Sequence, residues 1–182
     1  PIWTTTHLPL NPDHLPWRGR WPGADTAIPQ AREEAGRLLA PQVIYQVVPV
    51  KERTPAGSLL EGGLLLHSLD LLAALGPAGH LALAVYTIGP ALEARSRACS
   101  ERGEITESFL LDALGTVALD GLDRALRRHL GEELAPRGLC LGEPLSPGQL
   151  DWPLQDQPAL FAFLQPERIG VRLNEQGMMV PL

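Results

Sequence analysis

Residues 80–101 read HLALAVYTIGPALEARSRACSE and join a strand pattern directly to a helix pattern. Residues 80–88 form a continuous apolar run that is rich in β-leaning residues, which is typical of a central buried strand. The dipeptide Gly89-Pro90 follows, and proline at a first helical position is pre-organised for a helix. We therefore expect a central strand that leads at once into a helix over about residues 91–101.

The longest helical pattern runs from about residue 106 to residue 129. Polar side chains recur at every fourth position, so they form a slowly winding stripe along one side of the helix. Apolar side chains form a broad opposite side that would pack on the rest of the domain. The stripe consists of Ser108, Asp112, Thr116, Asp120, Arg124 and Arg128, and the apolar side of Ile105, Phe109, Ala113, Val117, Leu119, Leu122 and Leu126.

Further strands and helices are expected on either side of this core. A helix would run from Asp25 or Thr26 to Ala40, before Pro41 stops it. The β-branched run QVIYQVVPV at 42–50 predicts a strand. The remaining expected elements are a helix SLDLLAAL capped by Ser68, a strand at 138–141, a helix at 155–164, and two strand-like pieces, IGVRL and GMMVP.

The composition is typical of one globular domain, and the helix and strand patterns together indicate an α+β fold. The chain has 182 residues, of which 45% are hydrophobic and 20% charged, a balance that supports a packed core. Residues 1–24 are rich in Pro, Trp and Thr and are expected to form an extended arm, and residues 25–182 a single domain. We see no signal peptide, no apolar run long enough for a membrane, and no Cys-x-x-Cys pair, so a cytoplasmic location is expected.

The net charge and the absence of the known catalytic motifs argue against several classes of function. A net charge of −6 disfavours nucleic acid binding, which depends on clustered Lys and Arg. The sequence has no Gly-x-Ser-x-Gly elbow, no His-Glu-x-x-His, no P-loop and no Gly-x-Gly-x-x-Gly. Its five histidines are scattered, without a partner at metal-ligand spacing. We therefore expect no catalytic or metal-binding residue, and any chemistry would use a bound cofactor.

Two residues of the long helix allow more than one interpretation. The polar stripe is either a solvated face, with Asp120 and Arg124 as an exposed ion pair, or a surface on which Asp120 faces the ammonium group of a ligand. Gly115 lies in the middle of the helix, where glycine costs roughly 1 kcal/mol relative to alanine. It indicates a close approach of ligand or backbone, or tight helix packing.

The segment SPGQLDWPLQDQ at 146–157 is the most specific feature of the sequence. A Pro-Gly loop reverses the chain and can leave backbone NH and CO groups free for a ligand. The alternative is a plain turn, with Trp152 packed on the core.

Several segments together resemble the activation domain of cobalamin-dependent methionine synthase, in its small stand-alone form. They follow the family's order over about residues 40–181, and the pieces TIGPALE, LLDALG and SPG-x-x-DWPL are fairly specific in combination. The resemblance implies an α+β fold with a twisted, largely antiparallel sheet, packed helices and one long central helix.

The resemblance also implies a function. Members of this family bind S-adenosylmethionine in a shallow groove and press against a corrinoid (cobalamin) that a partner methyltransferase holds. When the cobalt becomes oxidised, an electron donor reduces it and S-adenosylmethionine methylates it. The domain itself supplies positioning, while the cofactors carry the chemistry.

The family's ligand-binding positions are only partly kept in this sequence. Asp120 falls where the family has an acid near the methionine ammonium. Pro144 stands where the family has an arginine, and proline offers no donor to the methionine carboxylate; Arg137 is a substitute that lies nearby in the sequence. Gln149 replaces a tyrosine. The implied cofactor-binding residues are Asp120, Ser146, Pro147, Gly148 and Gln149.

Three functional classes therefore remain open from the sequence. The first is a working reactivation module that binds S-adenosylmethionine and supports methylation of a partner's corrinoid. The second is a non-catalytic partner of a corrinoid protein that has lost the S-adenosylmethionine site. The third is an unrelated small-molecule binder on the same fold, because fold does not fix function.

Overall fold

Strands β2 (Gln42–Thr54) and β5 (His80–Thr87) form the centre of the structure, a computed structural model that describes residues 1–5, 8, 10, 24–67 and 78–181. The two strands pair antiparallel from Gln42 opposite Thr87 to Pro49 opposite His80. Both strands were predicted, and β2 extends beyond the expected 42–50 to Thr54. The central strand is thus confirmed together with its partner.

Further antiparallel pairs enlarge the sheet around β2. The first residues of β2 pair with β1 (Ile2–Thr4), and its last residues pair with β3 (Gly57–Leu60). Strand β4 (Leu65–Leu66) pairs in turn with β3. Every strand pair in the described residues is antiparallel, which confirms the expected α+β fold with a largely antiparallel sheet.

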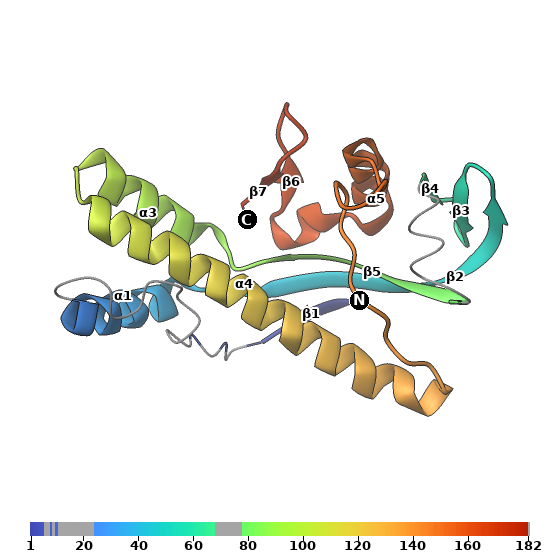
Figure 1. Cartoon of the computed structure of the whole chain (residues 1–182), viewed down its shortest axis with the longest axis horizontal. Coiled ribbons are helices and arrows are strands. Elements are labelled where there is room, and N and C mark those ends of the chain that lie inside the picture. Colours follow the sequence, from blue (N-terminus) through green and yellow to red (C-terminus); the bar gives the residue numbers. More distant parts are fainter. Residues whose placement is uncertain (6–7, 9, 11–23, 68–77, 182) are drawn as a thin grey trace.

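Side chains alternate between the two faces of β2 and β5, as the pleat of a strand requires. Val43 and Tyr45 belong to one buried cluster, whereas Ile44 and Val48 belong to a second. Figure 1 shows α4 and α1 on one side of the strands and α5 on the other. The helices are α1 (Ala24–Leu38), α3 (Pro90–Glu101), α4 (Ile105–Leu134) and α5 (Gln157–Leu164).

Helix α4 is the long central helix, and it has 30 residues. It continues beyond the predicted end at residue 129 because its apolar spacing continues through Leu130 and Leu134, both of which are buried. The prediction that Ile105 and Phe109 belong to the packed side was wrong, since their exposed fractions are 63% and 53%. The buried stripe begins at Leu110, and with a period of 3.6 residues both side chains then face away from it.

Gly115 of α4 is explained by close packing. A Cβ atom there would lie 3.3 Å from Cδ2 of Leu92 in α3 and 3.6 Å from Cδ1 of Ile88. Contacts this tight leave little room for a methyl group. Of the two interpretations of Gly115, tight helix packing therefore applies.

Several predicted elements of the second half differ in the structure. The strand expected at 138–141 is wrong: after a 3₁₀ turn (Ala135–Arg137) the chain is irregular, and Leu139 and Leu141 pack their side chains on the core without pairing. Helix α5 confirms the helix expected at 155–164, after a 3₁₀ turn at Leu154–Asp156. The two C-terminal pieces form a short hairpin, β6 (Arg172–Leu173) and β7 (Met179–Val180). The helix expected after Ser68 lies outside the described residues.

Candidate functional site

The polar stripe of α4 faces solvent at most of its positions. Asp112, Thr116, Asp120, Arg124 and Arg128 are all exposed. The expected ion pair between Asp120 and Arg124 does not form in the described structure, and Asp120 makes no hydrogen bond to another described residue. Within the described part of the chain, the Asp120 carboxylate thus has no hydrogen-bond or ion-pair partner.

Two residues that the sequence did not single out lie near Asp120. Tyr86 is half-buried on β5, on the face that α4 covers. Burial raises the pKa of the Tyr86 hydroxyl, and the negative charges of Asp123 and Asp120 raise it further. The two carboxylates therefore act on the same small region beside the sheet. Such a region favours a cation, because two like charges are close to each other without a described counter-ion.

The turn at residues 146–149 satisfies its own backbone donors. Gln149 Oε1 accepts a hydrogen bond from the Ser146 amide (2.9 Å), and the Ser146 carbonyl accepts one from the Gln149 amide (3.0 Å). The Gly148 amide donates to the carbonyl of Trp152 (2.7 Å), and Pro147 has no amide hydrogen. The expectation that the turn leaves amide donors free is therefore not met, so a ligand would meet its carbonyl oxygens.

Trp152 anchors this turn to the core. Its exposed fraction is 7%, and its indole Nε1 donates to Asp156 Oδ2 at 3.2 Å. The buried Asp156 carboxylate also accepts from the His67 amide (2.6 Å) and pairs with His67 Nδ1 (2.7 Å). The interpretation that packs Trp152 on the core is confirmed, and His67 links the turn to the end of β4.

The structure does not bring all the predicted site residues together. Asp120 lies on α4, on one side of the sheet, whereas Leu145 and Trp152 pack in the cluster on the other side. Arg137 is exposed at the end of the long helix and forms no ion pair with a described residue. Pro144 is exposed as well. A ligand that touched both Asp120 and the turn would have to extend past the edge of the sheet.

The described residues lack both a metal-binding cluster and a membrane-spanning helix. They contain no group of three or more His, Cys, Asp or Glu side chains arranged to hold a metal ion. None of their helices has the length and apolar character needed to cross a membrane.

The chain is similar in structure to a known domain. No family model matches the sequence, and no curated protein matches it. A solved structure described as the crystal structure of the MetH reactivation domain bound to AdoHcy superposes with a TM-score of 0.65 and 14% sequence identity. The match covers 100% of this chain and 74% of that chain. The chain therefore has the fold of that reactivation domain, as the sequence resemblance implied.

Proposed function

We propose that this chain binds S-adenosylmethionine and supports the reductive reactivation of a corrinoid held by a partner methyltransferase. The observation that carries the proposal is the shared fold over the whole chain with a domain whose structure holds AdoHcy. AdoHcy is S-adenosylmethionine without its methyl group, so a site for one has the shape of a site for the other.

Asp120 is the residue proposed to receive the amino group of the ligand. Its carboxylate is exposed and unpaired among the described residues. A charge-assisted hydrogen bond to an ammonium group contributes roughly 1.5–3 kcal/mol. Asp123 adds a second negative charge nearby, although solvent and salt weaken its effect at an exposed site.

The turn at 146–149 is proposed to contact the adenosine end. Because its amide donors are already engaged within the turn, the contacts would use carbonyl oxygens, which suit the amino group of adenine. The carboxylate end of the ligand lacks its expected cation, since Pro144 offers no donor. We therefore expect binding that is weaker by two or more orders of magnitude than with an arginine in place.

The chemistry would come from the bound groups. S-adenosylmethionine would supply the methyl group that the partner's corrinoid accepts after a donor protein has reduced it by one electron. The residues of this chain would hold and orient the methyl donor and exclude water. No residue is assigned a catalytic role.

A second candidate function is a non-catalytic partner of a corrinoid protein. It is favoured by two observations at the expected nucleotide groove: Pro144 in place of a cation, and a turn whose amides already donate to oxygens of residues 146, 149 and 152. In that case the fold would serve only for docking, and S-adenosylmethionine would not bind.

Calorimetric titration with S-adenosylmethionine separates these two functions. We expect weak binding to the unchanged protein, a loss of about tenfold or more in Asp120→Asn, and stronger binding in Pro144→Arg. Glu132→Gln removes another exposed carboxylate of α4 and serves as the matched control, with unchanged affinity.

Two other outcomes would contradict the proposed groove or the proposed function. Binding that Asp120→Asn leaves unchanged would place the groove elsewhere. Absence of binding in both the unchanged protein and Pro144→Arg would favour the non-catalytic partner.

A further inference from the structure

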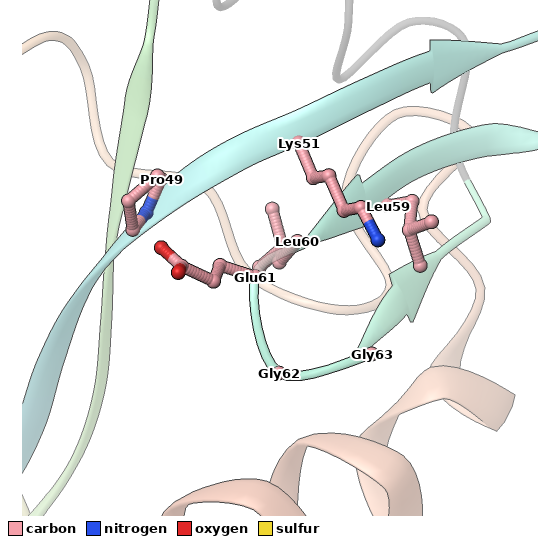
Figure 2. Close-up of a pocket in the computed structure, with 7 residues that line it drawn as sticks. All are labelled: Pro49, Lys51, Leu59, Leu60, Glu61, Gly62 and Gly63. Atoms are coloured by element: carbon pink, nitrogen blue, oxygen red, sulfur yellow. The ribbon is translucent and has the colours of Figure 1, made fainter.

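A hollow lies at the far end of β2 from the region beside Tyr86. Tyr86 pairs with Val43, whereas the hollow begins at Pro49, so the two places are separated along the strand. Its volume is about 300 Å³. The lining residues come from β2, β3 and the turn after β3, and they are Pro49, Lys51, Leu59, Leu60, Glu61, Gly62 and Gly63 (Figure 2).

A β-bulge in β2 sets the direction of the Lys51 side chain. The pairing of β2 with β3 shifts between Val50 and Glu52, which makes Lys51 the extra residue of a β-bulge. Bulges re-aim side chains and are common beside binding sites. Figure 2 shows the Lys51 side chain reaching over the hollow towards Leu59. Lys51 is also the only lysine of the sequence.

Glu61 provides the opposite charge from the other side of the hollow. Its backbone is fixed, because its amide donates to the Pro49 carbonyl at 3.0 Å. Figure 2 shows its carboxylate beside Pro49, away from the Lys51 ammonium. Neither charge forms an ion pair with a described residue. One cation and one anion thus face the same small space without neutralising each other.

The turn leaves this space open. Gly62 and Gly63 both have φ of 89°, a conformation that favours glycine. A Cβ atom at Gly63 would meet nothing within 4 Å, whereas one at Gly62 would lie 2.9 Å from Cε2 of Phe163. Pro49 and Leu59 are both half-buried and give the hollow its accessible apolar surface. The hollow therefore combines two opposite charges with the apolar surfaces of Pro49 and Leu59.

We propose that this hollow binds a small zwitterionic amino acid, with its ammonium group at Glu61 and its carboxylate at Lys51. A ligand with charges of one sign would be repelled by one of the two side chains, whereas a zwitterion satisfies both. The volume stands at the lower end of ligand sites, which suits a single amino acid with an apolar side chain. Because both charges are exposed, the dissociation constant is on the order of 1 mM.

An NMR titration of the ¹⁵N-labelled full chain tests this proposal. Three related probes are compared: L-leucine, N-acetyl-L-leucine, which lacks the cation, and L-leucinamide, which lacks the carboxylate. We expect the amide signals of Gly62 and Gly63 to shift saturably with L-leucine. Each of the other two probes should bind about two- to fivefold more weakly, which corresponds to one lost charge contact at an exposed site.

Variants assign each charge to its residue. Lys51→Gln should abolish the preference for leucine over leucinamide, and Glu61→Gln the preference for leucine over N-acetyl-leucine. Glu52→Gln removes a neighbouring exposed charge and should change neither. Equal shifts with all three probes, no shift with leucine, or preferences that survive both substitutions would overturn the proposal. S-adenosylmethionine binding in Lys51→Gln should stay unchanged, since the two sites are separate.

Discussion

At the scale of single residues, Asp156 connects two segments that are far apart in the sequence. Its buried carboxylate accepts hydrogen bonds from Trp152 and from the His67 backbone and pairs with the His67 ring. Asp156→Asn keeps the shape but turns an NH₂ group towards one of these donors. We expect a loss of about 1–3 kcal/mol in the free energy of unfolding, measured by urea denaturation.

The control for this prediction is Glu143→Gln, which removes an exposed carboxylate in the same region. It should change stability by less than about 0.5 kcal/mol. A similarly small effect in Asp156→Asn would mean that the Asp156 network does not anchor the turn at 146–149.

Single residues of the candidate site were only partly predictable from the sequence. Asp120 could be picked out because polar residues at every fourth position mark one side of a helix. Its neighbour Tyr86 could not, because it belongs to a strand. The pair of His67 and Asp156 is 89 residues apart in the chain, so no local spacing indicates it.

At the scale of elements, a cluster of polar and aromatic side chains joins β1, β2 and α4. The Tyr45 hydroxyl donates to Glu133 Oε2 at 2.5 Å and lies 3.0 Å from His129 Nε2. The Trp3 ring stacks on the His129 ring, with centroids 5.0 Å apart. The cluster therefore fastens the N-terminal strand to the long helix.

This cluster predicts a loss of stability in alkaline solution. Burial, and then Glu133, raises the pKa of Tyr45 to about 12, whereas an unfolded tyrosine titrates near 10. A raised pKa in the folded state stabilises the protein fully below pH 10, and this contribution disappears as the pH rises from about 10 to 12. The loss is on the order of 2–3 kcal/mol.

Urea unfolding at pH 9 and pH 12 measures this effect against Tyr45→Phe. The chain has two tyrosines, so Tyr86 contributes equally to both proteins. The unchanged protein should lose more stability than Tyr45→Phe over this range. Equal losses in the two proteins would show that Tyr45 titrates in the folded state as it does when unfolded.

Most elements could be predicted from the sequence because each carries a complete local pattern. The helix over residues 90–101 has its proline start, and α4 has its apolar period. The prediction of a strand at 138–141 was wrong because Leu139 and Leu141 pack their side chains against the core without pairing to a neighbouring strand. Apolar residues alone therefore do not distinguish a strand from an irregular segment that packs by its side chains.

At the scale of the whole molecule, the sheet separates the two halves of the proposed groove. Asp120 belongs to the side that α4 covers, and the turn at 146–149 is anchored to the side that α5 covers. We propose that one S-adenosylmethionine molecule reaches both. The shared fold with the MetH reactivation domain, at 14% identity, gives the arrangement of the elements, and the residues at Asp120 and the turn decide whether one ligand contacts both sides.

One NMR titration with S-adenosylmethionine tests this central claim most directly. The amide signals of Asp120 and Asp123 on α4 and of Gly148 in the turn are followed in the same ¹⁵N-labelled sample. We expect all three signals to shift and to saturate at the same ligand concentration, because one molecule would contact both segments. Absence of shifts at these residues, or saturation at different concentrations on the two sides of the sheet, would contradict it.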